Sequence, residues 1–289
     1  MGCEIPLCDK LNNDNNNHII DMNKESYFSF SKLSEPISKV DTFLTMFQRE
    51  YYLDRSYYGG MFGNSMKIIH KKDNTIYMMK IIPKILLRKT MCVSSVNNFY
   101  MRFINEYKHM NLNEIVKVVD NEDNIFVISK YSTYGNLLQF VIDKKQYLHT
   151  KEILYIINEV CNGLKYLHMK QLHHGNLCFK NIILYMKSNC NMLNTFITNY
   201  VIKLTDYSHC IMFDYCYKSA IPVLNNDMLM LKELIVQLVE YAYNEGTYPR
   251  EIQYLKERIM NLYMNDNDND SGNSSLTVDD VVNVVKDIM

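Results

Sequence analysis

The feature that most constrains the fold is a polar loop held between two strongly apolar segments. Apolar side chains recur at helical spacing over residues 150–168, which predicts a long amphipathic helix. A short apolar run follows at residues 182–184 and predicts a strand. The loop between them carries His174, Asn176 and Asn181. Loops mounted on rigid elements in this way are common positions for functional side chains.

Composition indicates a folded, non-secreted chain without strong charge. The sequence has 289 residues, with 31 Lys and Arg against 32 Asp and Glu, so its formal net charge is −1. This balance gives no electrostatic argument for binding nucleic acid. The eight cysteines include no Cys-x-x-Cys pair, which disfavours a zinc ribbon or a redox site. Because the sequence shows no secretory signal and no run of about 18 apolar residues, we expect a cytoplasmic protein.

The N-terminal segment differs in composition from the rest of the chain. Residues 1–40 are mostly polar, which predicts a disordered leader before a domain at 41–289. Gly2 and Cys3 match the acceptors of a myristoyl and a palmitoyl chain, and two chains together would anchor the protein at a membrane surface. Pro6 stands where the myristoylation motif prefers Ser or Thr, so an unmodified tail is the alternative that the residues favour.

The next stretch has the pattern of a small sheet. Residues 51–82 predict three strands, joined by a glycine turn and then by a polar turn. Gly60 and Gly63 lie in the first turn, and Lys80 lies near the end of the third strand. Taken alone, the two glycines indicate a simple hairpin. Aromatic residues at helical spacing then predict a helix over 98–109, and the apolar runs after it predict a second hairpin.

The ordered set of segments resembles the protein-kinase family. The resemblance covers roughly residues 50–240 and rests on motifs that are weak alone but specific in this order. They are Gly60-Met-Phe-Gly63, Tyr77-Met-Met-Lys80, Cys161-Asn-Gly-Leu-Lys-Tyr-Leu-His168, His174-Gly-Asn176-Leu-Cys-Phe-Lys-Asn181 and Lys203-Leu-Thr-Asp206-Tyr-Ser208. The resemblance implies an α+β, bilobal protein-kinase-like fold. It has a small antiparallel-sheet N-lobe at about 50–130 and a mainly helical C-lobe at about 131–289.

The resemblance also implies a phosphate-binding site. Gly60 and Gly63 would let the backbone close over the phosphates of ATP, and Lys80 would pair with their negative charge. Glu106 of the predicted helix is the candidate partner of Lys80, with a solvated surface glutamate as the alternative.

A hinge and a metal site follow from the same resemblance. Lys130 and Tyr131 would form the hinge beside the adenine, and Asn181 and Asp206 match the residues that hold magnesium. ATP and Mg²⁺ are therefore the cofactors that the resemblance implies. One residue argues against ATP binding. Met78 stands where the family has a small residue over the adenine, so its larger side chain would overfill the adenine site, and overfilling a close-packed site costs about 1–3 kcal/mol.

Asn176 is the main departure from the family. The family has an Asp there, which accepts the proton of the substrate hydroxyl, whereas an amide has no charge to align an alcohol. General-base assistance is typically worth about 10²–10⁴-fold, or about 3–5 kcal/mol of barrier. Cys178 replaces the Lys that steadies the transferred phosphoryl group, and the segment 206–227 is shorter than the family's activation segment. His174 corresponds to the loop His, which in the family packs in the core.

Three hypotheses for function follow from these residues. The departures favour a pseudokinase, a catalytically impaired signalling module that regulates or scaffolds another protein and keeps a nucleotide cleft. The alternative is a divergent but active ATP-dependent Ser/Thr kinase, supported by the retained lysine and metal-holding residues. A third hypothesis is a metal protein that uses His173, His174 and Cys178, although no fourth ligand is spaced to match them.

Overall fold

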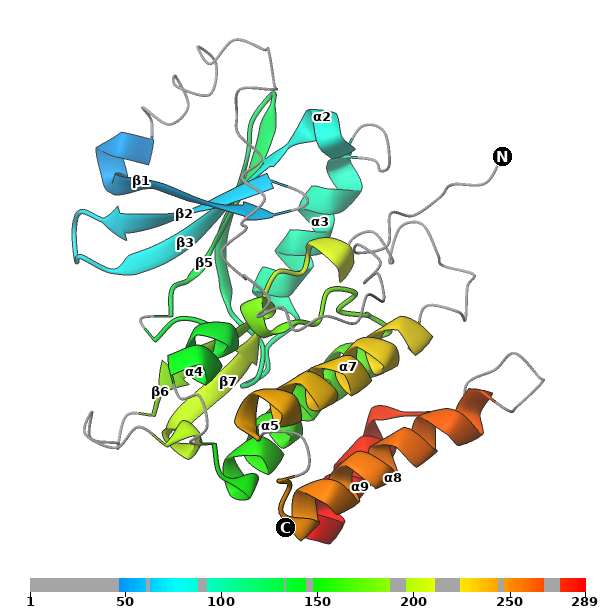
Figure 1. The fold of residues 1–289 in the computed structure, drawn as a ribbon. Helices are drawn as coiled ribbons and strands as arrows, with labels where there is room; N and C mark the ends of the chain where they lie inside the picture. Colours follow the sequence, from blue (N-terminus) through cyan, green and yellow to red (C-terminus); the bar gives the residue numbers. More distant parts are fainter. Residues whose placement is uncertain are drawn as a thin grey trace, which may run out of the picture.

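A computed structural model describes residues 47–60, 63–87, 93–132, 134–143, 148–187, 196–210, 224–243, 247–267 and 276–289. The fold is α+β and has two lobes, a five-stranded antiparallel sheet with a covering helix and a second, mainly helical part (Figure 1). This arrangement confirms the fold class that the sequence predicted. The predicted leader, with Gly2 and Cys3, lies outside the described residues.

The N-terminal lobe is built on one sheet. Its strands pair in the order β1-β2-β3-β5-β4, and every neighbouring pair is antiparallel. The strands are β1 (Tyr51–Gly60), β2 (Gly63–His70), β3 (Ile76–Pro83), β4 (Ile115–Asp120) and β5 (Asn124–Lys130). These bounds confirm the predicted strands and the predicted second hairpin. Met66, Met79 and Phe126 are buried on the face of the sheet that packs against Phe47.

The glycine turn is fixed by a close approach of two strands. Gly60 and Gly63 face each other across the β1–β2 hairpin, and Gly63 has a φ of 132°. A Cβ atom at Gly63 would lie 1.9 Å from the carbonyl oxygen of Ile81 on β3. Only glycine fits a site with this backbone angle and this neighbour. The hairpin is therefore held directly against the strand that carries Lys80.

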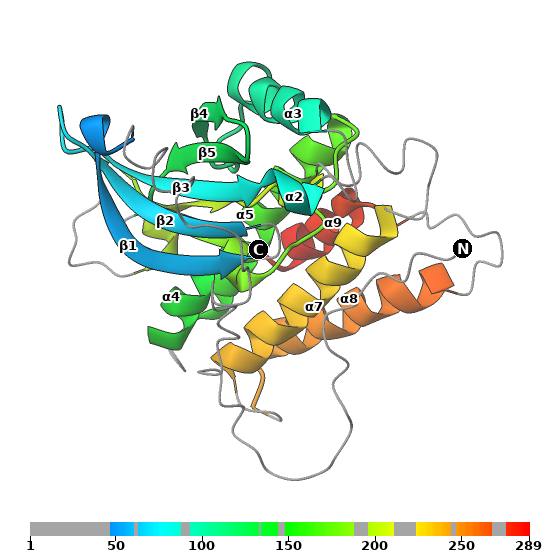
Figure 2. The ribbon, with the colours of Figure 1, turned by 90° about the horizontal axis from the view of Figure 1, so that it is seen from above.

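Helix α3 (Val93–Asn105) follows the short helix α2 (Lys84–Leu87) and lies beside β4 (Figure 2). The sequence predicted this helix over 98–109, and both predicted bounds are wrong because it begins and ends earlier. The N–H of Tyr107 donates to the carbonyl oxygen of Arg102, one residue further back than the α-helical pattern requires. The helix therefore ends before Glu106.

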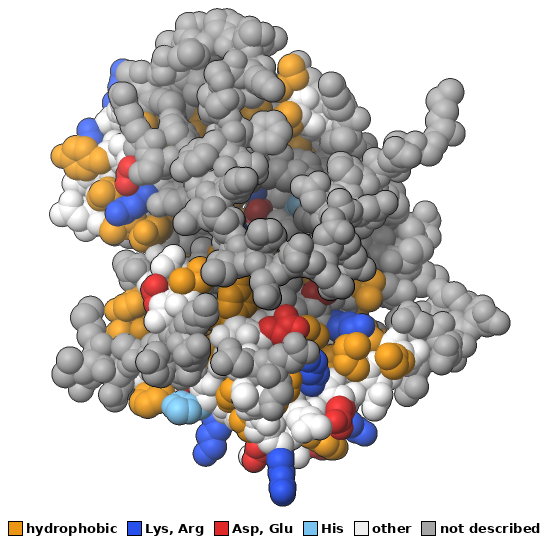
Figure 3. All heavy atoms as spheres, viewed as in Figure 1, with side chains coloured by type: hydrophobic (Ala, Val, Ile, Leu, Met, Phe, Trp, Pro, Cys, Tyr) orange, Lys and Arg blue, Asp and Glu red, His pale blue; other side chains and the backbone are white. Residues whose placement is uncertain are grey.

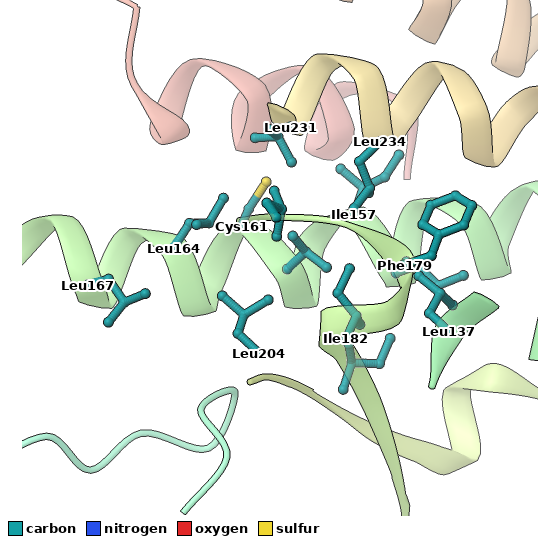
Figure 4. Close-up of a cluster of buried hydrophobic side chains, with 14 of the residues drawn as sticks. Leu137, Ile157, Cys161, Leu164, Leu167, Phe179, Ile182, Leu204, Leu231 and Leu234 are labelled. Atoms are coloured by element: carbon teal, nitrogen blue, oxygen red, sulfur yellow. The ribbon is translucent and has the colours of Figure 1, made fainter. Parts of the chain in front are cut away.

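The second lobe is organised around one central helix. Its elements are α4 (Leu137–Asp143), α5 (Thr150–Met169), α7 (Leu224–Ala242), α8 (Arg250–Asn267), α9 (Val278–Ile288) and a hairpin of β6 (Ile182–Met186) with β7 (Tyr200–Leu204). Figure 4 shows Ile157, Cys161 and Leu164 of α5 between Leu231 of α7 and Leu204 of β7. All five are fully buried, and burying a leucine or isoleucine contributes about 1.5–3 kcal/mol. The predicted central helix is confirmed.

The last two helices complete this lobe. Asp280 caps the start of α9, because its carboxylate accepts the N–H and the hydroxyl of Thr277 at 2.8 and 2.7 Å. No described helix is long and apolar enough to cross a membrane. Figure 3 shows acidic and basic side chains intermixed over the described surface of this lobe.

Candidate functional site

One buried carboxylate fastens the loop between α5 and β6 to the start of α7. Asp227 is fully buried, and its Oδ2 accepts the backbone N–H of His174 at 2.8 Å. Its Oδ1 accepts the backbone N–H of Gly175 at 2.7 Å, and Nε2 of His168 lies 2.9 Å from Oδ2. Burial alone would raise the pKa of Asp227, but the hydrogen bond and charge of His168 hold it below its usual value. The carboxylate therefore stays ionised and fixes the loop backbone.

The side chain of His174 faces the protein interior. Its Nε2 lies 3.0 Å from the carbonyl oxygen of Thr205, and its Nδ1 accepts the N–H of Asn176 at 3.3 Å. Burial lowers the pKa of His174, so the ring is neutral with the proton on Nε2. Gly175, the next residue, has a φ of 70°, where a side chain would strain the backbone. His174 therefore ties the loop to the end of β7 and is buried away from solvent.

At the other end of the loop, Asn176 and Cys178 are uncharged side chains. Nδ2 of Asn181 donates to the carbonyl oxygen of Asn176 at 2.8 Å, which closes the loop across five residues. The N–H of Thr205 donates to the carbonyl oxygen of Asn181 at 2.9 Å. Burial raises the pKa of the Cys178 thiol, so it is neutral as well. The loop thus presents a neutral amide and a neutral thiol where the family has an aspartate and a lysine.

Lys80, Asp206 and Ser208 form a compact polar cluster between the lobes. The ammonium group of Lys80 lies 2.5 Å from Oδ1 of Asp206 and 2.7 Å from Oγ of Ser208. The Ser208 hydroxyl also donates to Oδ1 of Asp206 at 2.6 Å. Burial would raise the pKa of Asp206, but the charge and hydrogen bond of Lys80 prevail and lower it. The ion pair joins β3 to the end of β7.

The predicted pairing of Lys80 with Glu106 is wrong. Glu106 lies beyond the end of α3 with 59% of its side chain exposed, and its carboxylate is 3.6 Å from Nε of Arg102. Tyr100 of α3 is buried beside the cluster, close enough for Asp206 and Ser208 to influence the pKa of its phenol. Burial and the charge of Asp206 both raise the pKa of Tyr100, so its phenol stays protonated.

The predicted hinge has its backbone acceptor occupied. The carbonyl oxygen of Lys130 accepts Nδ2 of Asn113 at 3.2 Å and the hydroxyl of Tyr185 at 3.0 Å. A carbonyl oxygen has two lone pairs, so this acceptor is satisfied within the chain. The Lys130 ammonium pairs with Glu114 at 2.6 Å, and the ring of Tyr131 is half-buried.

Comparison with known proteins identifies the family to which this arrangement belongs. The model of the family described as protein tyrosine and serine/threonine kinase matches residues 53–219, which is more than half of the chain. The chain belongs to the protein kinase family. The matched stretch contains the glycine turn, the Lys80–Asp206 pair and the whole loop between α5 and β6.

Several curated kinases are similar to this kinase over shorter stretches. Tyrosine-protein kinase Src64B of Drosophila melanogaster is 31% identical over 80 residues, which are 27% of this chain and 14% of that protein. Myosin light chain kinase family member 4 of Homo sapiens is 23% identical over 43% of this chain and 31% of its own length. A probable serine/threonine-protein kinase PLK of Dictyostelium discoideum is 26% identical over 51% of this chain and 14% of its own length. The matches therefore span less than a third of these relatives.

The kinase retains oxygen ligands that suit magnesium. Among the described residues, neither Oδ1 of Asn181 nor Oδ2 of Asp206 takes part in a hydrogen bond, because each side chain uses its other polar atom. Carboxylate and amide oxygens are ligands that Mg²⁺ accepts, together with water and phosphate oxygens. Asn181 and Asp206 would hold the ion, which would neutralise phosphate charge, and Lys80 would exchange Asp206 for a phosphate.

Sequence reasoning missed two residues of this kinase site. Tyr100 and Ser208 lie beside the Lys80–Asp206 pair, and the sequence assigned neither of them to the site. The ring of Phe103 on the same helix stacks on Tyr207, the residue after Asp206, with the centroids 4.2 Å apart. The sequence did offer one signal for Ser208, namely a serine at a position where the family motif has glycine.

Proposed function

We propose that this kinase domain is a pseudokinase, a catalytically impaired cytoplasmic module that binds nucleotide and regulates or scaffolds another protein. The observation that carries the proposal is Asn176, an amide at the position of the carboxylate that accepts the substrate proton. The loop closure from Asn181 to the carbonyl of Asn176 supports the assignment of this position, because it fixes Asn176 at the open end of the loop.

Two described carboxylates contact this region, and both are poor substitutes for the missing base. Asp227 is turned inward and accepts two backbone N–H groups of the loop. Asp206 is held by Lys80 and Ser208. The pKa of each is lowered, so each binds a proton weakly near neutral pH. General-base catalysis works best with a pKa near the operating pH.

A second candidate function is an active, divergent ATP-dependent protein kinase. Lys80, Asn181 and Asp206 favour it, because they supply the charge and the oxygen ligands that nucleotide and metal need. The same three residues are compatible with a pseudokinase that binds ATP and Mg²⁺ without transferring phosphate. Nucleotide binding and phosphate transfer therefore have to be measured separately.

Phosphate transfer distinguishes the two candidates. The purified full chain is incubated with radiolabelled ATP, Mg²⁺ and a generic protein substrate, and compared with Asp206→Ala and Asn176→Asp. We expect the wild type to match the Asp206→Ala background and Asn176→Asp to rise above it. Transfer by the wild type that disappears in Asp206→Ala would overturn the pseudokinase proposal.

Nucleotide binding is tested by thermal unfolding with ATP and MgCl₂. A one-site ligand at 100 times its dissociation constant raises the free energy of unfolding by about 2.7 kcal/mol. We expect a rise in the wild type that is lost in Lys80→Met. Lys84→Met is the matched control, since Lys84 pairs with Asp120 at 2.5 Å elsewhere in the same lobe. No shift at millimolar ATP would remove nucleotide binding from the proposal.

A further inference from the structure

Two histidines and an aspartate come together at the buried side of the loop. His168, His173 and Asp227 each offer one ligand atom, and these atoms all lie within 4.8 Å of one another. His168 is in the last turn of α5, His173 is in the loop, and Asp227 is in the first turn of α7. The rings of His168 and His173 have their centroids 5.4 Å apart. Three separate segments of the chain thus meet at this cluster.

We propose that this cluster is a binding site for a divalent transition-metal ion, with zinc as the best fit. Two imidazole nitrogens and one carboxylate form a ligand set that zinc accepts, with water in the fourth position. The ion would replace the proton shared between His168 and Asp227, whose atoms are already 2.9 Å apart. Zinc bonds of about 2.0–2.1 Å bring tetrahedral ligand atoms to roughly 3.3 Å, so the ring of His173 has to move closer.

The surroundings of the cluster favour a cation. Asp227 supplies a carboxylate charge that is fully buried. The end of α5 adds the negative end of a helix dipole beside His168. The backbone N–H groups of His174 and Gly175 hold the carboxylate in place, as outer-shell donors do around protein-bound metals. His168 keeps 15% of its side chain exposed, which gives water and the ion a route to the site.

This ligand set differs from the one that the sequence suggested. His174 directs its ring to Thr205 and Asn176, and Cys178 is not part of the cluster. His173 is the one residue common to both sets. An ion held here would connect α5, the loop and α7, so its binding would stabilise the folded chain without acting on a substrate. The proposal is independent of whether the kinase is active.

Metal content and thermal unfolding test the site. The full chain is treated with EDTA, desalted, incubated with ZnCl₂ alone and desalted again. We expect one zinc ion per chain by mass spectrometry and a rise in the melting temperature over the EDTA-treated protein. Replacement by Co²⁺ should give the visible absorption of a tetrahedral site. A chain that retains no stoichiometric zinc would overturn the proposal.

Two histidine variants make the test specific. His173→Gln should lose the bound zinc and the rise in melting temperature, and it spares the His168–Asp227 contact on which folding depends. His70→Gln is the matched control, because His70 also pairs with an aspartate, Asp73, at 2.8 Å on an exposed turn. His70→Gln should keep both effects. Zinc retained in full by His173→Gln, or lost equally in the control, would overturn the assignment.

Discussion

The two faces of the loop between α5 and β6 differ in their hydrogen bonding and in their charge. On the face turned to the core, Asp227 accepts two backbone N–H groups and contacts His168, and all of these groups are buried or half-buried. On the face at the open end of the loop, Asn176 and Cys178 bring no charge. The core face of the loop is thus held by residues other than Asn176 and Cys178, the two positions at which the loop departs from the family.

This difference explains how the fold accommodates Asn176 at a position where the family has an aspartate. Replacing a buried carboxylate that has three partners lowers the free energy of unfolding, because its partners would be left unsatisfied. An amide at a half-buried position disturbs no such network. The loop can therefore change its chemistry without changing its shape.

The largest expected effect is on the core face. Asp227→Asn replaces a charged acceptor by an amide and leaves at least one buried N–H of the loop without its partner. Breaking a buried charge pair costs about 3–5 kcal/mol. We expect a loss of that size in the free energy of unfolding, measured by urea denaturation. Asp73→Asn, which alters an exposed His–Asp pair, serves as the control and should leave the urea midpoint unchanged. A stable Asp227→Asn protein would contradict the comparison.

We expect low pH to reduce the stability that the core face of the loop contributes. Burial lowers the pKa of His173 and His174 below the ordinary 6.5, so the folded chain keeps these rings neutral. Below about pH 6.5 the unfolded chain binds more protons than the folded chain. The free energy of unfolding therefore decreases as the pH decreases. Asp206 and Asp227 have a lowered pKa as well, so their contribution is lost below 3.8 and does not enter this window.

Urea unfolding at pH 7, 6 and 5, with EDTA present throughout, measures this effect. We expect the midpoint to decrease stepwise over these three values. A midpoint that stays constant between pH 7 and pH 5 would show that the buried imidazoles do not carry the pH dependence.

The smallest effect is expected at the open end of the loop. Asn176→Asp is the reverse of Asp227→Asn, and it places a carboxylate at a half-buried position with no buried partner to lose. Substitutions of this kind usually change stability by about 1 kcal/mol or less. We expect the urea midpoint of Asn176→Asp to lie close to that of the wild type. A loss as large as that of Asp227→Asn would mean that the two faces do not differ.

Local patterns in the sequence predicted most of the fold, because strands, turns and helices each follow from apolar spacing. The helix predicted over 150–168 is confirmed nearly to the residue as α5, and the three strands predicted over 51–82 are confirmed as β1, β2 and β3. Asp227, at the end of the short segment 206–227, is fully buried in the first turn of α7.

The pairing of side chains was harder to predict. Lys80 and Asp206 are 126 positions apart, and their contact depends on how the lobes pack. Glu106 was misassigned because a single backbone hydrogen bond from Tyr107 to Arg102 ends α3 early. The family pattern assigned the motifs to positions along the chain, whereas the partner of each charged group followed from packing.

The occupied carbonyl of Lys130 bears on the choice of small molecules for this cleft. A flat heterocycle that directs an amino group at that oxygen would have to displace the hydroxyl of Tyr185 or the amide of Asn113. Each displaced group keeps a second partner, Oδ1 of Asn113 for the Tyr185 hydroxyl and Oγ1 of Thr205 for the Asn113 amide, so the loss is that of one ordinary hydrogen bond, about 0.5–1.5 kcal/mol. Compounds anchored on Lys80 and Asp206 avoid this penalty. A screening library for this kinase should therefore be rich in acidic and metal-chelating scaffolds and poor in aminopurines.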